Sequence, residues 1–149
     1  MADDVARVSR RVMLMASAGL WSGAAGATEG EAQAAMAAFT GGVEPRPGRV
    51  AIDIPPLVEN GNTVPIAVIA ESPMTEADHV RAIAVFNERN PQPHVITVRF
   101  SPLSGRAVLS THMRLATSQR LWAVAAMSDG SFWSESVQVV VTLAACVEG

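Results

Sequence analysis

The sequence of residues 121–143 is LWAVAAMSDGSFWSESVQVVVTL. Two runs rich in apolar, β-branched and aromatic residues flank the segment Ser128-Asp129-Gly130-Ser131. Asp-Gly between two such runs is typical of a β-hairpin, because both residues tolerate a positive φ. This stretch therefore predicts two antiparallel strands, residues 121–127 and 132–143, joined by a tight turn.

The sequence before this hairpin predicts five more strands. Its apolar residues alternate with polar ones or form short continuous runs, and clusters of Pro, Gly and Asn separate the runs. The expected strands are residues 50–54, 64–70, 80–87, 95–100 and 107–115. About seven strands at regular spacing predict an all-β fold, an immunoglobulin-like β-sandwich with two facing sheets.

A short helix is expected before the first strand. Thr28 and Glu31 have the spacing of a capping box, and Gly41 is suited to end the helix. The segment is rich in alanine and short, so it needs to dock on the sandwich to persist. We assign residues 28–48 to this helix and a linker, 49–143 to the sandwich and 144–149 to a C-terminal arm.

Residues 1–27 have the features of an export signal. Ser9-Arg10-Arg11 precedes an apolar run that ends in the small residues Ala25-Gly26-Ala27. This pattern resembles a twin-arginine signal peptide cleaved after Ala27, which predicts a periplasmic protein with no membrane segment in its mature form. An ordinary buried helix is the alternative interpretation.

The composition excludes several classes of function. The chain has 149 residues, a formal net charge of -3 and 49% hydrophobic residues, which suits one domain. All of its basic residues are arginines, and they form no basic run that would predict nucleic-acid binding. The sequence contains no glycine-rich phosphate loop, and we expect no cofactor. The single cysteine, Cys146, cannot form an intramolecular disulfide.

Cys146 is the best candidate for covalent chemistry. A thiolate is the strongest nucleophile that this chain can provide, and three residues beyond the last strand can reach about 10 Å. The other reactive side chains give weaker candidates. A metal site is disfavoured because the histidines are far apart in sequence, and a solvated loop explains the acidic cluster better than acid/base catalysis does. These residues are His79, His94 and His112, and Glu71, Glu76 and Asp78. We expect Trp122 and Trp133 to be packing residues rather than ligand platforms.

Several segments together resemble the SoxY family, the sulfur-carrier proteins of the bacterial Sox thiosulfate-oxidising system. The resemblance extends from Phe39 to Cys146 and includes the twin-arginine signal. The segments that carry it are Pro45-Arg46-Pro47-Gly48-Arg49-Val50, Val58-Glu59-Asn60-Gly61-Asn62-Thr63-Val64-Pro65, Ser72-Pro73-Met74-Thr75-Glu76-Ala77-Asp78, Phe100-Ser101-Pro102 and Met127-Ser128-Asp129-Gly130-Ser131.

The resemblance implies a function beyond what the residues alone indicate. Members of the family are immunoglobulin-like sandwiches that form a heterodimer with a SoxZ subunit. They carry sulfur intermediates on a cysteine of the C-terminal arm and present them to periplasmic Sox enzymes, among them a c-type cytochrome complex and a hydrolase that releases sulfate. By this resemblance Cys146 is the covalent attachment site, and the chain is a carrier without catalytic activity of its own.

The arm itself departs from the family pattern. The family motif is Gly-Gly-Cys-Gly, whereas residues 144–149 are Ala-Ala-Cys-Val-Glu-Gly. Alanine and the β-branched Val147 restrict the backbone, and Glu148 adds a negative charge beside an anionic adduct. Two alternatives therefore stay open. One is a SoxY-like interaction subunit whose cysteine is idle or forms an intermolecular disulfide, and the other is an independent thiol enzyme.

Overall fold

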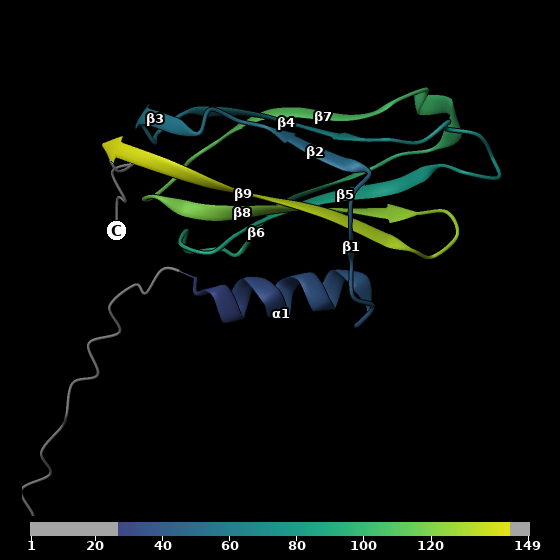
Figure 1. Ribbon diagram of the computed structural model, residues 1–149, viewed down its shortest axis with the longest axis horizontal. Helices are drawn as coiled ribbons and strands as arrows, with labels where there is room; N and C mark the ends of the chain where they lie inside the picture. Colours follow the sequence, from purple (N-terminus) through teal and green to yellow (C-terminus); the bar gives the residue numbers. More distant parts are fainter. Residues whose placement is uncertain (1–26, 144–149) are drawn as a thin grey trace, which may run out of the picture.

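The computed structural model describes residues 27–143, which form one helix and two facing β-sheets (Figure 1). The predicted all-β, immunoglobulin-like sandwich is confirmed. The elements are α1 (Glu29–Thr40), β1 (Arg46–Pro47), β2 (Val50–Asp53), β3 (Leu57–Asn60), β4 (Val64–Ala70), β5 (Val80–Asn87), β6 (His94–Arg99), β7 (Ala107–Met113), β8 (Gln119–Met127) and β9 (Phe132–Leu143), with a short 3-10 turn at Pro102–Ser104.

The larger sheet has the strand order β1-β9-β8-β5-β6, and β3 pairs with β9 as well. Neighbours in this sheet are antiparallel except β1 and β3, which both run parallel to β9. β1 pairs near the beginning of β9, where Arg46 is opposite Trp133, and β3 pairs near its end, where Asn60 is opposite Leu143. The long β9 therefore has a different neighbour at each end.

The smaller sheet contains β2, β4 and β7 in that order, all antiparallel. Its register is continuous from the pair Val64 and Met113 to the pair Ala70 and Ala107. No described element covers the outer face of this sheet, whereas α1 lies along the outer face of the larger one (Figure 1).

The main core lies between the two sheets. On β4, whose sequence is a nearly continuous apolar run, every second residue is buried, namely Val64, Ile66, Val68 and Ala70. Leu121, Ala123 and Ala125 of β8 supply the facing layer. Complete burial of one Val or Leu side chain contributes about 1.5–3 kcal/mol, so this shared interior holds the sheets together.

A second apolar cluster fixes α1 to the sandwich. Phe39 of the helix contacts Phe86 and Phe132, with ring centroids 6.1 Å and 6.0 Å apart. The predicted capping box is confirmed, because the Thr28 side chain accepts a hydrogen bond from the Glu31 amide and the Glu31 carboxylate accepts one from the Thr28 amide. The helix ends at Thr40, before a left-handed Gly41.

All seven predicted strands occur, and the bounds of β4, β5 and β9 are those predicted. The turn between β8 and β9 differs in detail. Only Gly130 has a positive φ, of 84°, whereas the Asp129 carboxylate accepts hydrogen bonds from the Ser131 hydroxyl and amide. The hydroxyl contact is the main cause of the lowered pKa of Asp129.

Two strands, β1 and β3, were absent from the sequence prediction. β1 lies in the segment assigned to a linker, and β3 follows a Pro-Pro pair that indicated the end of a strand. The export signal predicted in residues 1–27 lies outside the described residues except for Ala27. Within residues 27–143 no helix is long and apolar enough to cross a membrane.

Candidate functional site

The cysteine singled out by the sequence, Cys146, lies outside the described residues, which end at Leu143. The structure describes instead the point from which the chain continues toward it. That point is the end of β9, which Figure 1 shows at one tip of the sandwich. We call residues 140–143 the arm base.

The arm base is fixed by β3 on one side. The Gly61 amide donates to the Leu143 carbonyl at 3.1 Å, and the Thr142 hydroxyl donates to the Glu59 carbonyl at 3.2 Å. Upstream, the Val140 amide donates to the Pro56 carbonyl at 2.9 Å. Pairing thus continues to the last residue of β9, so the arm starts from a defined position.

A serine fixes the other side of the arm base, where the pairing of β8 with β9 stops at Gln119 and Val139. The Val141 amide donates to the Ser118 hydroxyl oxygen at 2.8 Å. The same hydroxyl lies 3.3 Å from the Val141 carbonyl oxygen, to which it donates. On this side of β9, the Ser118 side chain therefore takes the place of a β8 residue that would otherwise pair with Val141.

The side chains of the arm base contrast with its fixed backbone. Val140 is 47% exposed, Leu143 is 66% exposed, and Leu57, which pairs with Val140, is 59% exposed. Val58 is the buried residue of β3 and joins the main core. The arm base is consequently held by hydrogen bonds and by the core contacts of Val58 and the half-buried Val141, while Val140, Leu143 and Leu57 face solvent.

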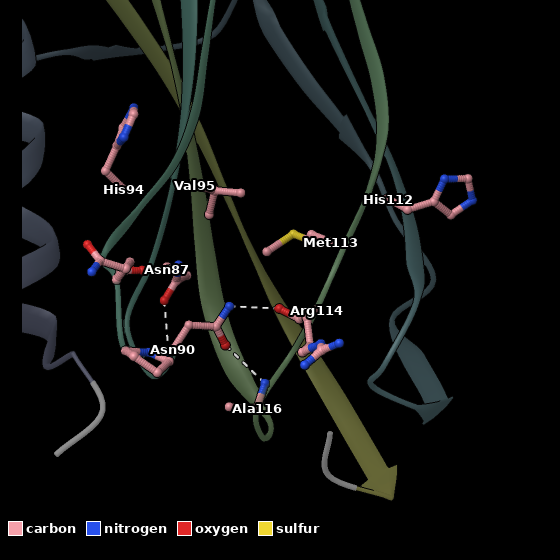
Figure 2. Close-up of a pocket in the computed structure, with 10 residues that line it drawn as sticks. Asn87, Asn90, His94, Val95, His112, Met113, Arg114 and Ala116 are labelled. Atoms are coloured by element: carbon pink, nitrogen blue, oxygen red, sulfur yellow. Dashed lines mark hydrogen bonds between the residues drawn. The ribbon is translucent and has the colours of Figure 1, made fainter. Parts of the chain in front are cut away.

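A pocket of about 500 Å³ opens at the same end of the sandwich (Figure 2). The Gly61 carbonyl connects it to the arm base, because it accepts a hydrogen bond from the Leu115 amide at 2.8 Å and Leu115 lies between two lining residues. The lining residues are Asn87, Asn90, Pro91, Gln92, His94, Val95, His112, Met113, Arg114 and Ala116.

The polar wall of the pocket is built around Asn90. Its amide nitrogen donates to the Arg114 carbonyl at 2.7 Å, and its side-chain oxygen accepts from the Ala116 amide and the Gln119 side chain, both at 2.9 Å. The Asn90 backbone amide donates to the Asn87 side chain at 2.9 Å. Asn87 and Gln119 are almost completely buried, so these bonds tie the loop before β6 to the segment after β7 and make the wall rigid.

The inner surface of the pocket is mainly apolar. Figure 2 shows Val95 and Met113 facing each other from the two sheets, and the imidazoles of His94 and His112 pointing away from them. The His94 ring packs 5.5 Å from Phe86 and its Nε2 lies 2.7 Å from the Thr97 hydroxyl. Among the residues that line this pocket, Arg114 is the one arginine, and there is no lysine.

The other candidates from the sequence do not form a reactive centre. Among the described residues, no group of three or more His, Cys, Asp or Glu side chains could hold a metal ion. In the acidic loop, Glu71 and Glu76 are exposed, and Asp78 lies 3.4 Å from the Arg49 guanidinium. The Nδ1 atom of His79 lies 2.9 Å from the Thr75 carbonyl oxygen.

Trp122 and Trp133 pack against the fold, as the sequence indicates. Trp122 is half-buried against the cluster beneath α1. Trp133 packs against the main core, its indole nitrogen donates to the Ser131 hydroxyl at 3.2 Å, and Arg46 and Arg49 lie over its ring at 5.7 Å and 5.5 Å. This cluster is located at the beginning of β9, far from the arm base.

The sequence analysis missed the pocket and the role of β3. The segment Leu57-Val58-Glu59-Asn60 has two apolar residues followed by two polar ones, so its polarity does not alternate, and it is only four residues long. The pocket had no local signal, because its walls come from the loop before β6 and from the end of β7.

Comparisons with known proteins bear on this site. A family model described as sulfur oxidation protein SoxY matches residues 36–146. The solved structure of the sulfur carrier protein SoxY from Chlorobium limicola f thiosulfatophilum is 26% identical, with a TM-score of 0.64 over 74% of this chain and 96% of that one. No curated protein sequence matches the chain.

Other solved structures share the fold at lower identity. A superoxide reductase (neelaredoxin) from Ignicoccus hospitalis is 17% identical, with a TM-score of 0.57 over 77% of this chain and 94% of that one. A putative superoxide reductase from Thermotoga maritima is 22% identical, with a TM-score of 0.53 over 69% and 89%. These likenesses show a common sandwich and nothing about chemistry.

Proposed function

The chain belongs to the SoxY family of sulfur oxidation proteins, and from this we propose that it is a periplasmic carrier that holds thiosulfate-derived sulfur on Cys146. The observation that carries the proposal is the extent of the family match, because the matched segment ends at residue 146, the only cysteine. The likeness to a SoxY sulfur carrier supports the same general role.

The chemistry needs only a thiolate from this chain. In loading, the Cys146 thiolate and thiosulfate form a sulfur–sulfur bond, which gives Cys–S–S–SO3⁻ and releases two electrons to a partner redox protein. In hydrolysis, water attacks the sulfonate sulfur, and sulfate and two protons leave while a persulfide stays on the cysteine. Catalysis of both steps belongs to partner enzymes, and the carrier supplies a nucleophile that can reach them.

The arm base supports such a role. A cysteine that is delivered to other proteins is best carried on a short segment that extends from a fixed point of the fold. Hydrogen bonds from Gly61 and Ser118 fix the last residues of β9. From Leu143, three extended residues cover about 10 Å, which suits delivery of a thiol into a neighbouring protein.

The family also implies partners. We propose a heterodimer with a SoxZ-like subunit, and periplasmic Sox enzymes as clients. The Ser9-Arg10-Arg11 segment supports export by the twin-arginine route. Replacement of both arginines by lysine should retain the precursor in the cytoplasm, which cell fractionation measures. Export that continued unchanged would contradict the assignment of this signal.

Intact-mass measurement tests the carrier proposal. The mature protein with its partner subunit is incubated with thiosulfate and the loading enzyme, and we expect sulfur adducts on the wild type and none on Cys146→Ala. A matched control combines Cys146→Ala with Ser136→Cys, which puts a thiol at an exposed position on β9. Adducts on this control equal to those on the wild type would contradict a role for the arm, and no adduct on the wild type would contradict the proposal.

A second function is favoured by the residues around the cysteine. The chain has Ala-Ala-Cys-Val-Glu-Gly where the family has glycines, which would suit a SoxY-like interaction subunit with an idle or disulfide-bonded Cys146. A non-reducing gel of the periplasmic protein detects the disulfide form, because an intermolecular disulfide adds the mass of the bonded protein and leaves no thiol to load, and the loading experiment above detects an idle cysteine. A free, loadable thiol excludes this second function.

A further inference from the structure

We propose that the outer face of the larger sheet binds a small organic carboxylate with an apolar body, in a pocket at the end of the sandwich opposite to the arm base. The pocket has a volume of about 460 Å³, and we call it the arginine pocket because Arg81 and Arg99 line it. Phe39 and Phe132 line it too, so it lies where α1 ends and β9 begins (Figure 1). The site is independent of Cys146 and of the carrier role proposed above.

A β-bulge turns the Arg81 side chain toward this pocket. In the pairing of β5 with β8, Val80 is opposite Met127 and Ala82 is opposite Ala126. Arg81 is therefore one extra residue on β5. The extra residue changes which side chains share a face, so that Val80 lies in the main core and Ala82 lies in the cluster beneath α1. Bulges redirect side chains, and here the redirected group is a guanidinium that lines a pocket.

Arg99 reaches the same pocket from β6. It is opposite Ala82 in the pairing of β5 with β6, so its side chain is on the face that α1 covers. The Phe100 amide donates to the Arg81 carbonyl at 2.8 Å, which joins the two backbone segments that carry the arginines. The Nε of Arg81 donates to the Met127 carbonyl at 3.0 Å and thereby fixes this guanidinium. Its remaining N–H groups can donate to a ligand.

The two arginines have no acidic neighbour in this pocket. Among the described residues that line it there is no Asp or Glu. Within residues 27–143 the only ion pair is that of Arg49 with Asp78, so neither Arg81 nor Arg99 has a carboxylate partner there. Two such guanidinium groups in one concave site favour an anion, and their planar forks match the geometry of a carboxylate.

The rest of the lining favours an apolar body on that anion. The rings of Phe39 and Phe132 lie with their centroids 6.0 Å apart, and Phe100, Ala82 and Ala126 complete the apolar wall. Pockets that bind small molecules combine an apolar lining with a few polar groups, and about 460 Å³ lies within their usual range. The combination of arginines with aromatic rings therefore indicates a carboxylate that carries an aryl or branched alkyl group.

Titration of the full mature chain with phenylacetate tests the proposal. Methyl NMR signals of Ala82 and Ala126, which line the pocket, should shift, while those of Val95 and Met113 at the opposite end should not. We expect phenylacetamide and acetate each to bind at least about tenfold more weakly, because the first lacks the charge and the second lacks the ring. Equal binding of either compound, no shift at all, or shifts only at Val95 and Met113 would overturn the proposal.

Two variants test the role of the arginines. Arg81→Gln and Arg99→Gln should each weaken phenylacetate binding roughly fivefold to tenfold, because each removes a charged hydrogen-bond donor. Arg120→Gln is the matched control, since it removes the same charge from the same face of β8, six residues from Ala126 and thus about 20 Å away. The control should bind phenylacetate as the wild type does. Equal affinities in the three variants would overturn the proposal.

N-acetylphenylalanine tests whether the ligand is a free acid or the C-terminal residue of a protein, because it carries a peptide bond beside its carboxylate. We expect phenylacetate to bind at least as tightly as this compound. Tighter binding of N-acetylphenylalanine would overturn the assignment to a small acid. Sulfur loading of Cys146 is measured separately, so a negative result here leaves the carrier proposal intact.

Discussion

The two ends of β9 are stabilised in different ways. At Phe132 and Trp133 the strand is fixed by side chains, through contacts with Phe39 beneath α1 and through Arg46 and Arg49 over the indole. At the arm base the strand is fixed mainly by hydrogen bonds, while Val140 and Leu143 stay exposed and only Val141 packs against the main core. One end is thus held by side-chain packing, and the other is held in position while part of its surface faces solvent.

Phe132→Ala should produce the largest effect and separate the two ends. It removes a buried ring from the cluster beneath α1, which costs about 3 kcal/mol of unfolding free energy. Urea denaturation measures the loss, and the alkylation rate of Cys146 in the folded protein should stay at the wild-type value. A change in that rate would show that the two ends are coupled.

Val58→Ala should act at the opposite end. Val58 is the buried residue of β3, and loss of two methyl groups should cost about 1.5 kcal/mol. We also expect faster hydrogen exchange of the Gly61 amide, which donates to Leu143. Exchange that stayed unchanged despite the lost stability would show that β3 does not depend on its core contact.

Ser118→Ala should have a smaller effect, confined to the arm base. The hydroxyl serves both the amide and the carbonyl of Val141, and its loss should cost about 1 kcal/mol. Ser110→Ala, on the exposed outer face of β7, is the control and should change stability by less than about 0.5 kcal/mol. Equal effects of the two variants would contradict the assigned role of Ser118.

Val140→Thr should have the smallest effect on stability. Val140 is 47% exposed, and threonine keeps the β-branched shape that a strand favours, so we expect a change below about 0.5 kcal/mol. Urea denaturation and binding of the SoxZ-like subunit are measured together. A loss of stability comparable to that of Val58→Ala would show that the exposed Val140 side chain also holds the arm base.

The sequence alone determined the local elements and the reactive residue. The apolar run of β4, the β-branched run of β9, the capping box of Thr28 and Glu31, and the Asp129-Gly130 turn are patterns of neighbouring residues, so the local sequence is enough to predict them. Cys146 could be chosen as the reactive residue from sequence alone, because it is the only cysteine and a thiolate is a strong nucleophile. The segments from residue 39 onward indicated the family.

Only the tertiary structure decided how the end of β9 is held and what lies beside it. Thr142 and Glu59 are 83 residues apart in the chain, and Asn90 joins Arg114 and Ala116 across 24 and 26 residues. Parallel pairing of a four-residue strand and a pocket between two sheets depend on which distant segments share the core. Local periodicity does not predict which distant segments pair, because that pairing depends on burial summed over the whole chain.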